Sequence, residues 1–215
     1  PARLQPLTLT TDYAEKFTAM NLPELGIVYL YFNMADPKIG HPPDPEQDRR
    51  NHLLRKAIRA GYDWPQRNRR FYNGIATVFP GTIPPGLDGY VEGVGMDSVT
   101  PDYERAKQYL KEGGWTDDNL PELDYNGTAS VVNTQMYEQF RGWMEKIGYP
   151  PKKIKFVQFA NFGDYNKAVK NRECGLIGMA WGLDYPDAEN VLQLFYGPNA
   201  SPGSSVSNFS DPEYD

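Results

Sequence analysis

Between residues 123 and 195 the chain alternates short strand-like segments with helix-like segments. Periodicity predicts strands at 123–125, 154–159 and 176–181, and helices at 134–147, 162–171 and 187–195. Where strands and helices alternate in this way, neighbouring strands run parallel and the crossovers between them are right-handed. The segment therefore predicts the α/β fold class, with parallel neighbours in one sheet.

The first half of the chain is expected to add a strand and three helices. The strand is 26–33, which is rich in β-branched and aromatic side chains. The helices are expected at 48–60, at 64–72, and from Thr100, which caps the third helix, to about 113. Residues 8–20 are expected to hold a strand and then a short helix at 13–18, and 74–100 to form a long loop.

The helix expected at 48–60 carries an apolar stripe and a basic face. The stripe, predicted to be buried, consists of Leu53, Leu54, Ala57 and Ile58. The basic residues lie largely off it: Arg49, Arg50, Arg55, Lys56 and Arg59, extended by Arg67, Arg69 and Arg70. Such a face is either solvated or an anion or partner patch, and a solvated face is the favoured interpretation.

Bulk properties exclude several classes of protein. The formal net charge is -6 and the sequence pI about 5.0, which argues against a nucleic-acid partner. The single cysteine, Cys174, cannot form an internal disulfide. No apolar run approaches the roughly 20 residues that cross a bilayer. Pro1 is not an initiator methionine and no signal peptide follows it, so we expect both ends to lie within a longer protein.

Residues suited to catalysis or metal binding are few. His41, His52 and Cys174 are interpreted as surface, capping and buried residues rather than as catalytic groups. Asp184, Asp187 and Glu189 resemble a calcium loop only weakly, and Asp187 is better explained as a helix cap. No phosphate-binding glycine motif is present, and we expect neither a metal nor a cofactor.

The segment 181–187, Trp-Gly-Leu-Asp-Tyr-Pro-Asp, follows an apolar strand and precedes a helix. Open α/β folds keep their ligand crevice at the carboxyl ends of strands. A cationic ligand group with an apolar neighbour would suit Asp184 beside Trp181. On these residues alone, a core tryptophan and a turn aspartate remain an equal alternative.

Several stretches share their order and spacing with one family. They are Tyr31-Phe32-Asn33, Leu54-Arg55-Lys56-Ala57-Ile58 with Tyr62-Asp63, Ile83-Pro84-Pro85, Asp102-Tyr103-Glu104-Arg105-Ala106-Lys107 with Leu110, Gly113 and Gly114, Trp181 to Asp187, and Asn208 to Asp215. In these stretches the chain resembles the extracellular solute-binding proteins of family 5, the peptide- and nickel-binding receptors of bacterial ABC importers. Ala188 departs from the family, which usually has proline there.

The resemblance implies a periplasmic-binding-protein-like (type II) fold, in which two lobes close on a ligand. Residues 1–215 match the carboxyl-terminal lobe, a mixed, mostly parallel sheet flanked by helices. Residues 1–26 would be a hinge-proximal segment and 196–215 a loop returning toward the other lobe. The implied location is periplasmic or extracytoplasmic in a bacterium. The implied partners are a peptide or other small solute, the importer's membrane permease and the missing amino-terminal lobe.

The resemblance also implies a ligand-binding site. Asp184 matches the aspartate that pairs with a peptide's α-amino group, and Trp181 matches a tryptophan that lines the pocket. Phe162 falls where a second aromatic wall often stands, and Tyr185 belongs to the same site. The backbone of Ala180 and Gly182 would bond an extended peptide as an added strand.

Two other functions stay open at this point. A hydrolase could use Asp184 and Asp187 as paired carboxylates, provided that the two face each other across a substrate. An adaptor domain could use the arginine-rich helix as its contact surface. The favoured interpretation is a binding protein without catalysis.

Overall fold

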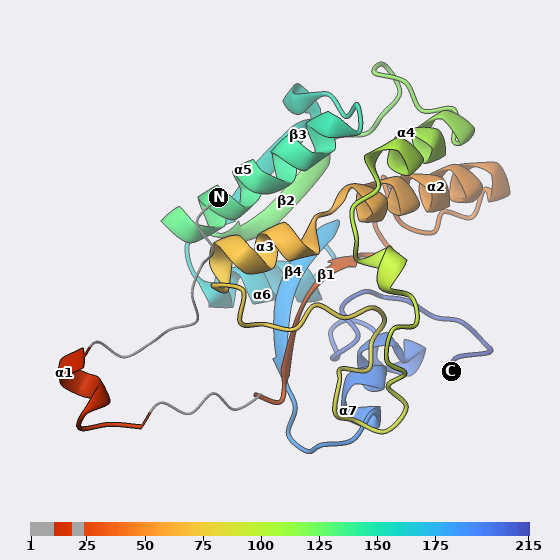
Figure 1. Cartoon of the computed structure of the whole chain (residues 1–215). Coiled ribbons are helices and arrows are strands. Elements are labelled where there is room, and N and C mark those ends of the chain that lie inside the picture. Colours follow the sequence, from red (N-terminus) through yellow and green to blue (C-terminus); the bar gives the residue numbers. More distant parts are fainter. Residues whose placement is uncertain (1–10, 19–23) are drawn as a thin grey trace.

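The computed structural model describes residues 11–18 and 24–215, and its centre is a four-stranded sheet (Figure 1). The strands are β1 (Gly26–Phe32), β2 (Leu123–Thr128), β3 (Ile154–Phe159) and β4 (Leu176–Gly182), in the spatial order β1-β4-β2-β3. β2 runs parallel to both β3 and β4, whereas β1 is antiparallel to β4. The fold is therefore α/β with a mixed, mostly parallel sheet, as the sequence predicts.

Helices cover both faces of the sheet, with α5 and α3 in front of it and α6 behind in Figure 1. The α-helices are α1 (Thr11–Ala14), α2 (Pro45–Gly61), α3 (Trp64–Phe71), α4 (Tyr103–Glu112), α5 (Val131–Lys146), α6 (Phe162–Lys170) and α7 (Glu189–Leu192). Short 3-10 helices are η1 (Met96–Ser98), η2 (Pro151–Lys153), η3 (Gln193–Phe195) and η4 (Gly197–Asn199). No helix in the described ranges is both long and apolar enough to cross a membrane.

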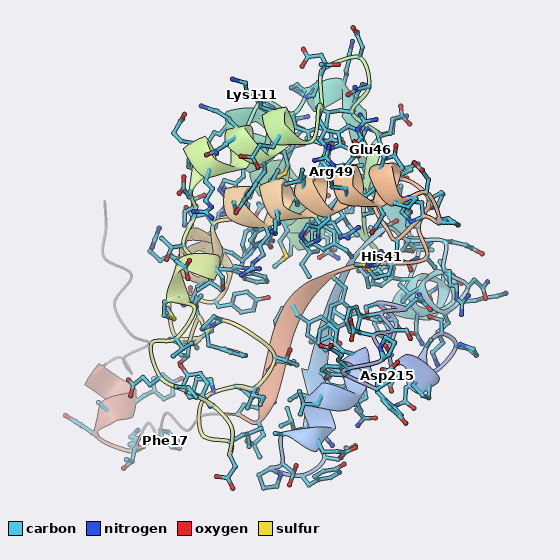
Figure 2. All side chains as sticks on the ribbon, turned by 90° about the vertical axis from the view of Figure 1, so that its right-hand side faces the viewer. Phe17, His41, Glu46, Arg49, Lys111 and Asp215 are labelled. Atoms are coloured by element: carbon cyan, nitrogen blue, oxygen red, sulfur yellow. The ribbon has the colours of Figure 1, made fainter. Side chains whose placement is uncertain are left out.

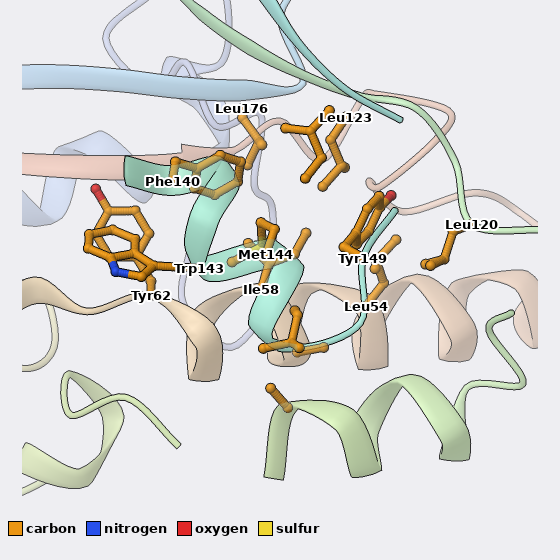
Figure 3. Close-up of a cluster of buried hydrophobic side chains, with 14 of the residues drawn as sticks. Leu54, Ile58, Tyr62, Leu120, Leu123, Phe140, Trp143, Met144, Tyr149 and Leu176 are labelled. Atoms are coloured by element: carbon orange, nitrogen blue, oxygen red, sulfur yellow. The ribbon is translucent and has the colours of Figure 1, made fainter. Parts of the chain in front are cut away.

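The larger hydrophobic cluster lies between α2, α5 and one face of the sheet (Figure 3). Leu54 and Ile58 of α2 meet Phe140, Trp143 and Met144 of α5, and all five side chains are almost completely buried. Burial of side chains of this size contributes about 1.5–3 kcal/mol each, so this cluster is the main source of stability.

A second cluster occupies the opposite face of the sheet. Because strand side chains alternate between faces, Leu176 of β4 joins the first cluster and Ile177 joins the second. There Ile177 packs with Val169 of α6, Val191 of α7 and Leu194 of η3. The second cluster thereby fixes α7 against β4, beside the segment 181–187.

Several predicted helix starts differ from the structure, and one cause explains three of the differences, those in α2, α4 and α5. α2 begins at Pro45 rather than Asp48, because the Asp44 carboxylate accepts the Gln47 N–H at 2.9 Å. α4 is capped by Asp102 rather than Thr100, and α5 begins at Val131 rather than 134 because Ser130 caps it. In each helix a capping side chain that the apolar pattern does not reveal sets the first turn.

The basic face of α2 is also corrected in part. Arg55, which was expected off the buried stripe, is buried and donates to the carbonyls of Ile39 and Gly40 at 2.6 and 2.7 Å, whereas Leu53 is only half-buried. Burial lowers the pKa of Arg55. Figure 2 shows Arg49 beside Glu46, with which it forms an ion pair at 2.8 Å.

Arg67 of α3 is buried as well, among the rings of Tyr62, Phe71 and Trp143. Arg55 and Arg67 are therefore not available to an adaptor surface, whereas Arg49, Lys56 and Arg59 of α2 stay exposed.

The strand expected at 123–125 is longer than predicted, because β2 continues to Thr128. The short helix expected at 13–18 is α1, at Thr11–Ala14, and residues 8–10 and 19–20 of that prediction lie outside the described residues. The helix expected at 187–195 divides into α7 and η3. The loop expected at 74–100 is confirmed, apart from η1.

The burial of Leu54 in the larger cluster predicts how a substitution there changes the free energy of unfolding. Leu54→Ala should lower the free energy of unfolding by about 2–5 kcal/mol in urea titrations, because it leaves a cavity in the larger cluster. Leu25→Ala is the matched control, since Leu25 is 45% exposed, and should change the free energy by less than about 0.5 kcal/mol. Equal effects of the two substitutions would contradict the assignment of the core.

Candidate functional site

The carboxyl half of β4 has one covered face and one open face. Met179 and Trp181 pack against the second cluster, whereas Ala180 and Gly182 are exposed on the opposite face. A Cβ atom placed on Gly182 would meet no heavy atom of its surroundings within 4 Å. The open face therefore has room for another molecule above the end of β4.

One edge of β4 is also free at this end. Leu183 donates to Leu25 and Asn33 donates to Gly175, both at 2.9 Å, so the odd-numbered residues of β4 bond β1. In an antiparallel pair the intervening residues point their N–H and C=O groups the other way. β2 pairs only with Leu176 and Ile177, at the amino end of β4, and does not reach its carboxyl end.

The backbone groups of Ala180 and Gly182 therefore face an edge that no described strand occupies. The carbonyl of Gly178, nearer to β2, is taken by the Tyr165 hydroxyl at 2.9 Å. Such an edge offers donors and acceptors to an extended backbone.

Trp181 is half-buried at the border between the second cluster and solvent. Its indole N–H donates to Oδ1 of Asn190 in α7 at 2.8 Å. One side of the ring is packed and the other part remains accessible. This arrangement combines the two alternatives left open by the sequence, a core tryptophan and a site tryptophan.

The acids that follow β4 differ in what they bind. Asp184 is exposed, and its carboxylate forms no hydrogen bond or ion pair with the part of the chain that the structure describes. The Asp187 carboxylate accepts the Glu189 N–H at 2.8 Å just before α7, but the N-cap residue of α7 is Ala188, so the prediction that Asp187 is the cap is wrong. Only Asp184 therefore keeps its full capacity for a ligand.

Tyr185 is 45% exposed, and its hydroxyl donates to the carboxylate of Glu189. That hydrogen bond raises the pKa of the Tyr185 hydroxyl. Within residues 11–18 and 24–215 there is no group of three or more His, Cys, Asp or Glu side chains placed to hold a metal ion.

Phe162 is 61% exposed at the first position of α6, directly after the carboxyl end of β3. Val131 and Val132, which no sequence pattern singled out, are 75% and 52% exposed after the carboxyl end of β2. Parallel strands bring their carboxyl ends to one edge of a sheet, so these apolar side chains and the end of β4 share that edge. A correct assignment of Ser130 as the cap would have revealed the two valines.

The histidines and the cysteine lie outside this site. His41 contacts Asp48 at 2.6 Å near the start of α2, and burial together with nearby Lys56 and Arg55 lowers the pKa of His52. Cys174 is buried, and burial raises the pKa of its thiol to about 12, which leaves it unreactive.

A surface hollow of about 340 Å³ lies between the ends of α4 and α5. Leu110, Leu120 and Ile147 form its floor but are each less than a tenth exposed, so the hollow offers little apolar surface to a ligand. α5 leads from there through η2 into the amino end of β3, so the hollow lies at the end of the sheet opposite to the candidate site.

The family model described as "Bacterial extracellular solute-binding proteins, family 5 Middle" matches residues 3–203. The chain therefore belongs to family 5 of the bacterial extracellular solute-binding proteins. This is a family of binding proteins, as the sequence motifs indicated. A comparison with curated protein sequences finds no match to this chain.

Solved structures share the fold at low sequence identity. The Escherichia coli murein tripeptide binding protein MppA has a TM-score of 0.67 at 18% identity, over 90% of this chain and 35% of its own. DppA from Helicobacter pylori, in complex with the peptide STSA, has a TM-score of 0.69 at 20% identity, over 88% of this chain and 34% of its own.

A dipeptide binding protein from Pseudoalteromonas sp. SM9913, in complex with Met-Leu, has a TM-score of 0.65 at 19% identity, over 88% of this chain and 35% of its own. The chain thus spans about a third of the length of each of these proteins.

The different contacts of the two aspartates can be tested by unfolding. Asp187→Ala should lower the free energy of unfolding by about 0.5–2 kcal/mol, because the Glu189 N–H loses its acceptor. Asp184→Ala should change it by less than about 0.5 kcal/mol. If Asp184→Ala destabilised the protein as much as Asp187→Ala in urea titrations, Asp184 would be a structural residue and not a free ligand group.

Proposed function

We propose that this chain is the carboxyl-terminal lobe of the substrate-binding protein of a bacterial ABC importer, and that its ligand is a short peptide. The observation that carries the proposal is the Asp184 carboxylate, which has no partner among the described residues, beside an edge of β4 that no described strand occupies. Peptides are also the ligands printed for solved proteins of this fold, STSA for one and Met-Leu for another.

The geometry suits a peptide in three ways. The ammonium group at the peptide's amino end pairs with Asp184, which has no competing partner among the described residues. The extended backbone of the peptide bonds Ala180 and Gly182 along the free edge, a mode that tolerates many side chains. Trp181 and, at the same end of the sheet, Phe162 supply apolar surface for those side chains.

The proposal includes a second lobe. The chain covers about a third of the length of its structural neighbours, and the carboxyl edge of its sheet carries exposed apolar side chains. Residues 1–215 are taken as one lobe, with 1–26 near the hinge and 196–215 returning toward the other lobe. Closure of the two lobes removes the ligand from water and strengthens the charge pair.

The proposed location is the periplasm or another extracytoplasmic space of a bacterium. This location is supported by structural neighbours that are described as periplasmic proteins. The proposed partner in the membrane is the permease of the importer, which receives the peptide when the lobes open.

A hydrolase is less well supported. It requires two free carboxylates that face a substrate. Asp187 accepts the Glu189 N–H at the start of α7, so Asp184 would have to act alone. We therefore do not propose catalysis.

The charge pair predicts the effect of a single substitution. In the two-lobed protein, Asp184→Ala should weaken the binding of trialanine at least tenfold, measured by isothermal calorimetry, because the ammonium group loses its buried partner. Asp117→Ala is the control, since Asp117 is an exposed acid at the opposite end of the sheet, and its affinity should equal that of wild type.

N-acetyl-trialanine, which has no ammonium group, completes the test. It should bind the wild type weakly and lose little further affinity in Asp184→Ala. If Asp184→Ala bound trialanine as tightly as the wild type does, the proposed charge pair would be refuted. Absence of binding of any di- to tetra-alanine by the wild type would refute the peptide ligand itself.

A further inference from the structure

Asn190 is a buried polar residue beneath the candidate site. It is 1% exposed and lies in the first turn of α7. It follows Trp181 and Tyr185 in the sequence and lies beside β4 in the fold. Its Oδ1 accepts the indole N–H of Trp181 at 2.8 Å, whereas its Nδ2 is buried and has no hydrogen-bond partner among the described residues. An unsatisfied buried amide nitrogen is costly, so packing alone does not explain an asparagine here.

The orientation of this amide follows from chemistry. An indole nitrogen is only a donor, so Oδ1 and not Nδ2 must face Trp181. At hydrogen-bond distance the Asn190 side chain satisfies the indole, and its amide also lies close enough to the Tyr185 hydroxyl to oppose the rise in that hydroxyl's pKa. A leucine of similar shape would avoid the unsatisfied nitrogen but would leave the indole N–H without an acceptor.

Trp181 requires such an acceptor because packing holds it only partly. The ring is half-buried at the border of the second cluster, and its neighbours in β4, Ala180 and Gly182, direct no large side chain toward it. Two contacts hold Asn190 in place. The neighbouring Val191 is fully buried, and the backbone N–H of Asn190 donates to the Asp187 carbonyl at 3.2 Å.

We infer that Asn190 is a positioning residue for ligand binding, which acts by fixing the indole of Trp181 as one wall of the site. Asn190 does not touch the ligand in this arrangement. The inference rests on the proposed function and adds to it. The hydrogen bond from the Trp181 indole to Asn190 of α7 sets the orientation of the ring surface that a peptide side chain would contact.

A double-mutant cycle in the two-lobed protein tests the inference, with trialanine and Ala-Phe-Ala as probes. Asn190→Leu should weaken binding about five- to tenfold when Trp181 is present. In a Trp181→Phe background the same substitution should change affinity less than twofold, because phenylalanine has no N–H to lose. Asn190→Asp keeps an oxygen acceptor and should retain more affinity than Asn190→Leu.

A spectroscopic signature gives a readout that does not depend on ligand. In ¹H–¹⁵N spectra of the 215-residue chain, Trp181→Phe identifies the indole resonance of Trp181. That resonance should move upfield and exchange faster with water in Asn190→Leu, while the resonances of Trp64, Trp115 and Trp143 stay in place.

The outcomes separate the two proposals. If wild type binds the probes and Asn190→Leu binds them equally well, or if Asn190→Leu costs the same affinity with and without Trp181, the positioning role is overturned and the proposed function stands. If the wild type binds neither probe, and Asp184→Ala likewise binds neither, the proposed function fails. The positioning inference then fails with it.

Discussion

The antiparallel pairing of β1 with β4 is the contact on which the rest of the structure depends. It joins residues 26–32 to residues 176–182 over seven paired positions, whereas β2 pairs with only two residues of β4. The carboxyl half of β4 is thus held by one neighbour and extends past the other. This single arrangement creates a free strand edge, an open face at Gly182 and a support for Trp181 at the same place.

The two hydrophobic clusters have different consequences. The larger one, between α2, α5 and the sheet, contains most of the large buried side chains and supplies most of the stability. The second lies under α7 and positions the residues that follow β4. Because opposite faces of one sheet carry the two clusters, the site can keep an exposed carboxylate and a half-exposed indole while the larger cluster stays closed to water.

Local patterns predicted the sheet well and the helix starts poorly. The strand at 154–159 was predicted with its observed bounds, and the strands at 26–32 and 176–182 to within one residue, because apolar runs with turn residues at both ends are a local signal. The caps Asp44, Asp102 and Ser130 were missed, since a cap depends on one hydrogen bond to a backbone group three residues away. The exposed Val131 and Val132 were missed for the same reason.

The sequence by itself determined the α/β order, the family motifs and the position of Asp184 after a strand, because all three are properties of neighbouring residues. Only the tertiary structure decided that β1 pairs with β4 across about 150 residues of chain, that Arg55 and Arg67 are buried, and that Asn190 holds the indole of Trp181. Those facts depend on strand register and on packing between elements. The hydrophobic periodicity of a single segment predicts neither of them.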